Sequence, residues 1–329
     1  MNKKILIIGG GAAGIFAAIT AAELSPTSEV TVIDKGPLLT KVRISGGGRC
    51  NVTHSCFDPK ALVKNYPRGE KELLGLFSRF QPKDTIEWFK QRGVALKVED
   101  DGRMFPTTDS SETIINCLLN ECKRLNIQLH TQKKITHVAR IDEQFHVTCA
   151  DESILIADRL MLATGNSPQG HSLAQELGHT IVPPVPSLFT FNVPTSPLLE
   201  LSGRSVDHAI IGIEGTKFEQ SGPLLLTHWG FSGPAALKLS AWAARYLHEC
   251  DYKTTIYINW LPELSLHQLE KQFLALKQAK PTLTLSGLND YGIAKNLWKR
   301  LIETASLSPE QKLVQMSHKQ LSQLAKKLH

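Results

Sequence analysis

The sequence predicts an α/β fold built on a parallel sheet and joined to an inserted α+β domain. Three observations predict it. An unbroken run of Ile and Leu, Ile5–Ile8, leads directly into the glycine-rich segment Gly9–Gly14 and then into an Ala-rich helical segment. Five prolines crowd the stretch from Pro183 to Pro197, which is typical of a crossing between domains. Beyond them, short β-branched runs give way to helical periodicity from about residue 264. We therefore expect a first domain over residues 1–183 and a second over residues 184–329.

Composition sets the broad class of the protein. With 42% apolar and 21% charged residues in 329, the chain can bury a large core, which excludes a disordered, collagen-like or coiled-coil protein. Six cysteines without a CxxC pair indicate reduced thiols in a cytoplasmic protein, and the histidine spacing predicts no metal site.

Lys3-Lys4 before an apolar run could imitate a signal peptide, but Gly9–Gly11 interrupts this run, and no later apolar run is long enough for a membrane span. The formal charge of +6 permits an anionic ligand and gives no ground to expect nucleic acid.

The first elements predict a dinucleotide site. Gly9, Gly11 and Gly14 satisfy GxGxxG after the strand Ile5–Ile8 and before the helix expected over Ile15–Leu24. In this pattern the first glycine permits a tight turn, the second lets the backbone approach a diphosphate, and the third permits close helix–strand packing. A second strand, Glu29–Ile33, ends in Asp34, 20 residues after Gly14. A carboxylate there can accept hydrogen bonds from ribose hydroxyls and would repel a 2′-phosphate, so FAD or NAD is preferred over NADP.

A second glycine-rich segment lies at Ser45–Asn51, flanked by Arg43 and containing Arg49. A flexible surface loop is one interpretation. Arg43 and Arg49 are charged hydrogen-bond donors beside consecutive glycines, and they favour a second interpretation. In it, the loop wraps around a diphosphate or the edge of a flavin. Cys50 has no resolving partner, so a packed, bystander thiol is favoured over a redox thiol.

Further along, helices are expected at about Pro82–Arg92 and from a Ser110 cap through Leu125. Alternating runs within residues 127–156 predict a small antiparallel meander. A buried strand, Arg159–Leu162, then ends in Ala163–Gly165, a return turn typical of FAD-binding Rossmann proteins rather than simple NAD dehydrogenases. No second GxGxxG follows, so a nicotinamide donor, NAD(P)H, would dock transiently without a Rossmann domain of its own.

These patterns give the candidate cofactor-binding residues. They are Gly9, Gly11, Ala12, Ala13, Gly14, Asp34, Lys35, Arg43, Ser45, Gly46, Gly47, Gly48, Arg49, Cys50, Asn51, Ala163, Thr164 and Gly165. No catalytic residue is assigned, because no GxSxG or comparable nucleophile motif occurs.

Several motifs together carry a resemblance that spans essentially the whole chain. They are Gly9–Gly14, Ile44–Thr53, Phe105–Ser111, Leu162–Gly165, Gly178–Pro183, Pro186–Leu188 and Leu226–Pro234. On these motifs the chain resembles bacterial FAD-dependent oxidoreductases of the aminoacetone oxidase family of FAD-binding enzymes. The resemblance implies a glutathione-reductase-like, Rossmann-type FAD domain with a meander and an inserted domain made of a β-barrel and helices. It also implies that backbone groups of Ile135 face the adenine.

Two departures from the family pattern follow. The turn after Gly165 is shortened, which is expected to reshape the pocket. The family's C-terminal FAD segment, which supports the diphosphate and the flavin ring, is not found before His329. A missing segment supplied in trans is therefore one expected partner.

In the second half, strands are expected at Phe189–Val193, Ser205–Ile213, Lys217–Phe218, Leu224–Thr227 and Lys253–Trp260, with helices at Pro234–His248, Leu266–Lys277, Gly292–Thr304 and Ser317–Leu328. His228 and Trp229 are placed on a strand-to-helix turn, where they could line a substrate pocket or pack between domains. Lys319, Lys326 and Lys327 are interpreted as a solvated helix face.

The leading hypothesis is an FAD-dependent oxidoreductase that passes hydride between flavin N5 and a small organic substrate or a nicotinamide donor. Two alternatives stay open. One is a truncated or split flavoprotein fragment with weak or no FAD binding, and the other is a flavoprotein that acts on RNA.

Overall fold

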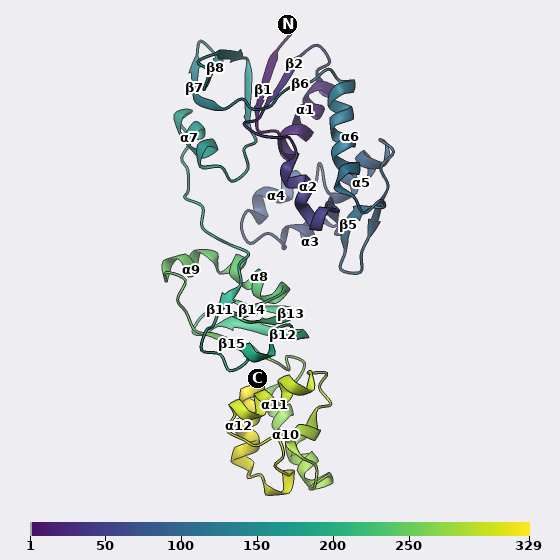
Figure 1. Ribbon diagram of the computed structural model, residues 1–329, viewed down its shortest axis with the longest axis vertical. Helices are drawn as coiled ribbons and strands as arrows, with labels where there is room; N and C mark the ends of the chain where they lie inside the picture. Colours follow the sequence, from purple (N-terminus) through teal and green to yellow (C-terminus); the bar gives the residue numbers. More distant parts are fainter. Residues whose placement is uncertain (1) are drawn as a thin grey trace. The chain divides into compact units, whose positions relative to one another are not determined.

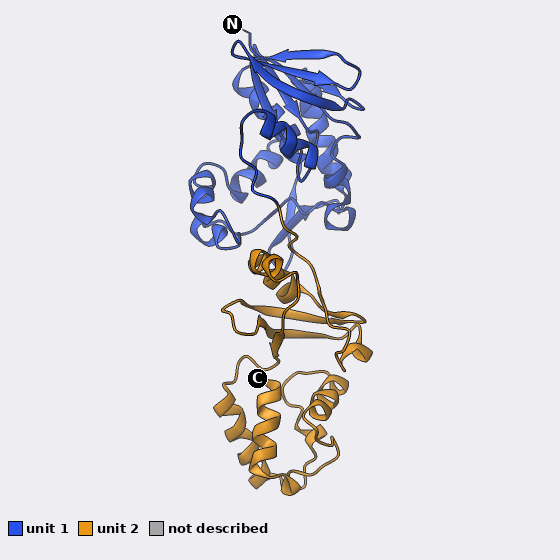
Figure 2. Cartoon of the chain, turned by 90° about the vertical axis from the view of Figure 1, so that its left-hand side faces the viewer, with its two compact units in different colours: residues 1–183 blue, residues 184–329 orange. Residues whose placement is uncertain are grey.

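The computed structural model describes residues 2–329 and divides into two compact units, Met1–Pro183 and Pro184–His329, coloured blue and orange in Figure 2. Each unit has a hydrophobic core of its own, and each is described by itself below. Within residues 2–329, no helix combines the length and apolar character needed to cross a membrane.

The first unit is built on a parallel sheet with the strand order β10-β1-β2-β6. Its central strands are apolar on both faces, so they are buried, and Ile7 is only 1% exposed. Helices α1 and α6 pack side by side next to this sheet (Figure 1). Ser110 caps α6 through its side chain, and Ile114, Ile115 and Leu118 form the buried stripe of that helix. The strands are β1 (Lys4–Ile8), β2 (Glu29–Ile33), β6 (Gln128–His130) and β10 (Arg159–Leu162), and the helices are α1 (Ala12–Leu24) and α6 (Ser111–Arg124).

Smaller elements complete this unit. An antiparallel meander is formed by β7 (Ile135–Ile141), β8 (Gln144–Cys149) and β9 (Ile154–Ala157), and helix α7 (Pro168–Glu176) packs on β7. A second small sheet has the order β3-β5-β4, formed by β3 (Thr53–His54), β4 (Leu96–Val98) and β5 (Arg103–Pro106). The remaining helices are α2 (Thr40–Ile44), α3 (Pro59–Val63), α4 (Glu70–Phe77) and α5 (Pro82–Lys90), with a 3₁₀ turn at Ser45–Gly48.

The structure confirms the α/β class and corrects several expectations in this unit. Strand β6 belongs to the parallel sheet, paired with β2, and not to the antiparallel meander. Strand β10 is an edge strand and is not fully buried, since Met161 is 38% exposed. Helix α1 starts at Ala12, three residues before the expected start. Helix α2, which ends directly before the second glycine-rich segment, was not expected, and neither were α3 and α4.

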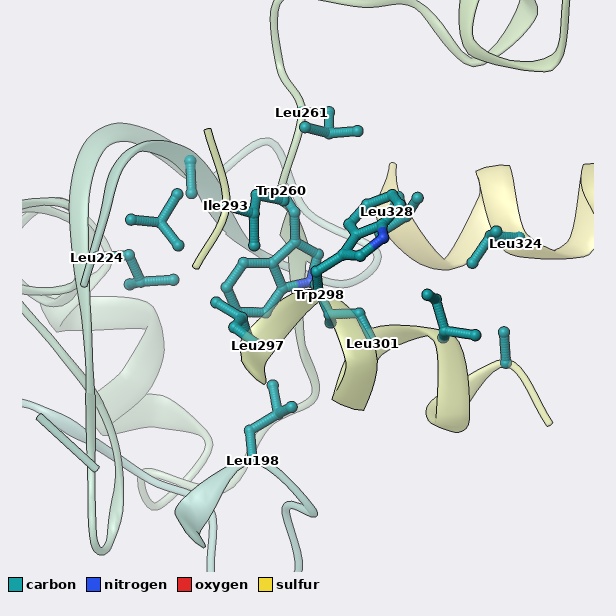
Figure 3. Close-up of a cluster of buried hydrophobic side chains, with 14 of the residues drawn as sticks. Leu198, Leu224, Trp260, Leu261, Ile293, Leu297, Trp298, Leu301, Leu324 and Leu328 are labelled. Atoms are coloured by element: carbon teal, nitrogen blue, oxygen red, sulfur yellow. The ribbon is translucent and has the colours of Figure 1, made fainter. Parts of the chain in front are cut away.

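The second unit contains an antiparallel sheet with the order β11-β14-β13-β12-β15. Helix α8 packs on one face of this sheet. A helical part follows, in which α12 packs against both α10 and α11, and its buried side chains continue the core of the sheet. Figure 3 shows Trp260 and Trp298 at the centre of this shared core, among leucines of α11 and α12. The strands are β11 (Phe191–Asn192), β12 (Ser205–Ile213), β13 (Glu219–Thr227), β14 (Gly230–Ser232) and β15 (Ile256–Asn259), and the helices are α8 (Pro234–Trp242), α9 (Ala244–Glu249), α10 (Leu266–Ala279), α11 (Lys295–Thr304) and α12 (His318–Leu328).

This unit confirms the α+β class but not the barrel implied by the resemblance. In the described chain the five strands form an open sheet, whose edge strands β11 and β15 have only two and four residues. The strand expected at Lys217–Phe218 is not formed, because these residues lie in the turn before β13, and the strand expected at Leu224–Thr227 is the second half of β13. Strand β14 follows β13 in a hairpin. His228 and Trp229 therefore lie on a strand-to-strand turn. The helix expected from Pro234 is broken at Ala243 into α8 and α9.

Candidate functional site

The glycine turn after β1 is shaped by contacts that only glycine allows. Gly9 has φ +114°, and a Cβ there would lie 2.3 Å from the carbonyl oxygen of Ala163. A Cβ on Gly14 would lie 1.8 Å from the carbonyl oxygen of Gly9. These two glycines therefore bring the start of α1 against the turn and against the end of β10. Their roles are internal to the fold.

Gly11 differs from its two partners in the motif. Its φ of −82° suits any residue, and a Cβ there would meet no atom within 4 Å. Gly11 is the N-cap of α1, whose first turn has no acidic residue and no side-chain cap. The free N–H groups and positive dipole end of α1 are thus left facing open space beside a residue without a side chain. This arrangement suits a close-lying anion, because neither a side chain nor a negative charge stands in its way.

Asp34, directly after β2, fixes the backbone of two turns, the glycine turn after β1 and the turn after β2. Its Oδ2 accepts a hydrogen bond from the Gly10 N–H at 2.7 Å, and its Oδ1 accepts one from the Gly36 N–H at 2.8 Å. Each carboxylate oxygen retains capacity for a further donor. The sequence predicted that Asp34 faces a ribose. It did not predict that Asp34 also holds the glycine turn in place.

Two hollows meet at this turn. The larger has a volume of about 770 Å³ and follows the glycine turn, the start of α2 and the Ala163–Gly165 return. The smaller, of about 260 Å³, is walled by Ile8, Ile135 and Leu173. Both are lined by Gly9, Asp34, Lys35, Thr164, Asn166 and Gly170. An extended ligand with a flat apolar end and an anionic middle fits such a pair of connected hollows.

Most predicted site residues in the first strand–turn–helix and in the return turn are brought together around these hollows. The lining contains Gly9, Gly11, Ala12, Ala13, Asp34, Lys35, Ile135, Ala163, Thr164 and Gly165, while Gly14 supports the turn from behind. Lys41, Lys133 and Gln169 also line them and were not predicted. Lys133 follows β6, and placing β6 in the parallel sheet would have brought it to this edge.

Ile135 lines the smaller hollow, and its backbone carbonyl accepts a hydrogen bond from the Gln169 side chain. Gln169 lies in the first turn of α7, which sits close to the return turn because a Cβ on Gly170 would come within 1.8 Å of Thr164 Oγ1. The Ile135 carbonyl thus already has one donor. That its backbone groups face an adenine stays a prediction.

The second glycine segment, Ser45–Asn51, adopts an unusual backbone. Gly46, Gly47 and Gly48 have φ values of +56°, +70° and +87°, and Cys50 has +64°. A Cβ on Gly46 would lie 2.7 Å from the Phe105 ring, whereas Gly47 and Gly48 face open space. The segment is therefore an ordered, left-handed turn packed on β5 rather than an extended linker. It does not line the two hollows described above.

Arg43 and Arg49 both form ion pairs within the first unit. Arg43 pairs with Glu112 in the first turn of α6. Arg49 pairs with Glu99 at 2.5 Å and lies 4.0 Å above the Phe105 ring, in a cation–π contact. The Glu99 carboxylate raises the pKa of Arg49, which stays fully charged. Contact of these arginines with a diphosphate or a flavin edge stays a prediction.

Cys50 is 5% exposed, and burial raises the pKa of its thiol, with a smaller opposing effect from a Ser45 hydrogen bond. A buried, protonated thiol is a weak nucleophile, so its environment favours the packed, bystander interpretation.

The fold and the glycine turn define a Rossmann-type nucleotide-binding protein. A family model described as HI0933-like protein Rossmann domain matches residues 3–304, and the chain belongs to that family.

Three curated relatives align with most of the chain. Over 316 residues it is 27% identical to a 3-dehydro-bile acid delta(4,6)-reductase of Clostridium scindens, which covers 93% of this chain and 76% of the relative. Over 312 residues it is 31% identical to a ribosomal RNA dihydrouridine synthase of Escherichia coli and 29% identical to one of Haemophilus influenzae, covering 91% of this chain and 72% of each relative. The relatives are enzymes, which confirms the expectation of an enzyme, and the family supports an oxidoreductase that uses FAD. None of the three relatives is named for a reaction of aminoacetone, and membership of the aminoacetone oxidase family stays a prediction.

Proposed function

We propose that the protein is an FAD-dependent reductase of carbon–carbon double bonds conjugated to a carbonyl group. One observation supports FAD as the cofactor. Two connected hollows meet at the uncapped start of α1, where Gly11 leaves space that no protein atom fills. The Gly11–Ala13 backbone would hold the diphosphate, and Asp34, which borders both hollows, would accept hydrogen bonds from the adenosine ribose. The smaller, apolar hollow beside Ile135 and Leu173 would take the adenine.

Two different relatives support the type of reaction. A 3-dehydro-bile acid with delta(4,6) unsaturation carries its double bonds in conjugation with the 3-oxo group. In uridine, the C5–C6 bond that becomes saturated in dihydrouridine is conjugated to the C4 carbonyl. In both cases the β-carbon accepts hydride and the α-carbon accepts a proton. Bound FAD, once reduced, would supply that hydride, and NAD(P)H is the proposed source of its electrons.

The chain's own residues would act through placement and electrostatics. The α1 start and the lysines around the hollows, Lys35 and Lys41, favour the anionic diphosphate. Asp34 opposes a 2′-phosphate, so the resident dinucleotide is FAD and not NADP.

The test begins with the purified protein and its visible spectrum after addition of FAD. We expect flavin absorbance that survives gel filtration, bleaching on anaerobic addition of NADH or NADPH, and reoxidation by a small conjugated ketone such as a 4-en-3-one steroid. If the protein retains no FAD, the proposal that FAD is its cofactor is wrong. A reduced flavoprotein that reoxidises no faster with conjugated substrates than with their saturated analogues contradicts the reaction.

RNA is the second candidate substrate, and the two ribosomal RNA dihydrouridine synthases favour it. Here the protein would be incubated with ribosomal RNA from a strain lacking its own synthase, together with NADPH, and the RNA digested for mass spectrometry. A gain of two mass units in one uridine-containing fragment supports RNA as the substrate. An unchanged digest with an active flavin contradicts it.

A further inference from the structure

The helical end of the chain carries an excess of positive charge. Residues 264–329 contain ten lysines and arginines against four acidic residues, an excess equal to the +6 of the entire chain. The other 263 residues carry 27 basic and 27 acidic side chains and are electrically balanced. The whole-chain value, which is modest, therefore hides a strongly basic helical segment.

Most of this charge is exposed and uncompensated. Within residues 2–329, ion pairs engage only Lys299 and Arg300 among these ten side chains, and Lys277 donates to the Met316 carbonyl. The other seven are exposed and take part in none of the ion pairs of the described chain: Lys271, Lys280, Lys295, Lys312, Lys319, Lys326 and Lys327.

Three of these lysines share one face of α12. Leu321, Leu324 and Leu328 form the buried face of this helix, so Lys319, Lys326 and Lys327 lie on the opposite, solvent side. We call these three residues the α12 lysine face. The Trp260 N–H donates to the Leu328 carbonyl at 2.8 Å, and leucines of α12 pack around Trp298 (Figure 3), so the helix that presents the face is anchored to the core at its last turn.

The rest of the surface of residues 264–329 limits the kind of partner that can bind there. Val314, at 56%, is the one large apolar side chain that is exposed between residues 264 and 329. A membrane-binding helix needs an apolar face to insert, and base stacking needs exposed aromatic rings. This surface has no exposed apolar face and no exposed Phe, Tyr or Trp ring, and it is suited to a regular row of phosphates contacted in water.

We propose that the α12 lysine face, with the neighbouring exposed lysines of residues 264–329, binds the phosphate backbone of RNA. This inference rests on the second candidate substrate above and assigns to the helical segment the sequence-independent part of its recognition. A second basic stretch, residues 35–83 with ten basic and three acidic side chains, belongs to the first unit and includes Lys35 and Lys41 of the nucleotide site, whereas the α12 lysine face belongs to the second unit.

The experiment measures binding of the full chain to a fluorescein-labelled single-stranded RNA of about 20 nucleotides by fluorescence anisotropy over a range of salt concentrations. The variant is K319Q/K326Q/K327Q. Its matched control is K217Q/K238Q/K253Q, which removes three exposed lysines of the second unit outside residues 264–329 that form no ion pair in the described chain. Loading with FAD and the thermal midpoint check that both variants are folded.

For the α12 variant we expect the Kd to rise at least about tenfold and the slope of log K against log salt to fall by about 2, since each lost phosphate contact removes about 0.7. The control should stay within about twofold of the unaltered protein. Equal binding by both variants and the unaltered protein overturns the proposal, as does an equal loss in both. Loss of binding to phosphatidylglycerol vesicles without loss of RNA binding also overturns it.

Reduction of a conjugated ketone, measured on the same samples, separates this proposal from the proposed function. The α12 variant should reduce the small ketone at the unaltered rate while losing RNA binding, which supports the inference. RNA binding that is indifferent to α12 in a protein that reduces the ketone overturns only the inference.

Discussion

The carboxylate of Asp34 and the backbone N–H of Gly10 are joined by a hydrogen bond of 2.7 Å, although the two residues lie on different strand–turn segments. The second carboxylate oxygen accepts from the Gly36 N–H. One side chain therefore sets the position of the glycine turn, and it also borders both hollows that meet there. The residue proposed to bind ribose is also the residue that holds the diphosphate turn in place.

Replacement of Asp34 should consequently affect both stability and binding. In Asp34→Ala the Gly10 and Gly36 N–H groups lose their acceptor, which should lower the free energy of unfolding by about 1–3 kcal/mol. FAD affinity should fall at least about tenfold, which equals about 1.4 kcal/mol. Urea unfolding and flavin fluorescence titration measure the two effects. Asp207→Ala, at an exposed aspartate, is the control and should change neither. Normal FAD binding by Asp34→Ala would contradict the proposed ribose contact.

The glycines of the turn allow binding and folding to be separated. Gly11→Ala places a methyl group in open space, so stability should change by less than about 1 kcal/mol while FAD affinity falls about tenfold. Gly14→Ala would place its Cβ 1.8 Å from the Gly9 carbonyl oxygen, and should destabilise the fold by about 1–3 kcal/mol or more. Thermal melts of the apo-protein and FAD titrations of both variants test this. If Gly11→Ala bound FAD normally, a diphosphate could not lie against that residue.

The first strand–turn–helix unit was predictable from sequence because its determinants are local. An apolar run, three spaced glycines and an acidic residue after the next strand fix β1, α1 and β2 over little more than 30 residues. The internal roles of Gly9 and Gly14 agree with the sequence argument. The start of α1 was placed late because Ala12–Gly14 look like turn residues until the helix behind them is known.

What the sequence could not supply depends on distant partners. Strand β6 has three residues, too few to show a period, and its partner β2 lies far back in the chain, so it was assigned to the meander and Lys133 was missed. Arg43 and Arg49 were recognised as charged donors beside glycines. Their acceptors, Glu112 and Glu99, come from other elements, and no pattern in the sequence links them.

The cysteines should differ sharply in reactivity. Cys122 is fully buried in α6, and burial raises the pKa of its thiol to about 11, whereas Cys56 and Cys250 are partly exposed. At pH 8 iodoacetamide should alkylate Cys56 and Cys250 and leave Cys122 unmodified until the protein is unfolded in guanidinium. Peptide mass spectrometry at timed intervals measures this order. Alkylation of Cys122 at the rate of Cys250 would show that α6 opens readily.

Trp298 should be a major source of stability in the second unit. Its side chain is fully buried, and its indole N–H donates to the Leu285 carbonyl at 2.9 Å. Trp298→Phe keeps an aromatic ring but removes the donor, and should cost about 1–3 kcal/mol, whereas Trp298→Ala should cost about 3–5 kcal/mol. Guanidinium unfolding followed by circular dichroism measures both. The exposed Trp229, changed to Phe, is the control and should be nearly neutral. A neutral Trp298→Phe would mean that the hydrogen bond contributes nothing.

Acid sensitivity of the first unit should involve Glu121. This carboxylate accepts from Arg124 at 2.7 Å and from Arg92 at 3.0 Å, and these two guanidinium groups, Arg124 foremost, hold its pKa below the ordinary value of 4.5. Because its pKa is lower in the folded than in the unfolded chain, the unfolded chain binds more protons in the window below 4.5. The stabilisation is complete above that window and is lost as the pH falls through the folded pKa.

Glu121→Gln should therefore lower stability at pH 7 and flatten its pH dependence. The free energy of unfolding of the unaltered protein should drop between about pH 5 and pH 3, and the variant should lose less over the same range, because its amide does not titrate. Urea unfolding at several pH values measures both slopes. Glu72→Gln, at an exposed glutamate, should retain the slope of the unaltered protein. Parallel curves for all three proteins would mean that the Glu121 cluster is already equally charged in the folded and unfolded chain, and that the acid sensitivity originates at other carboxylates.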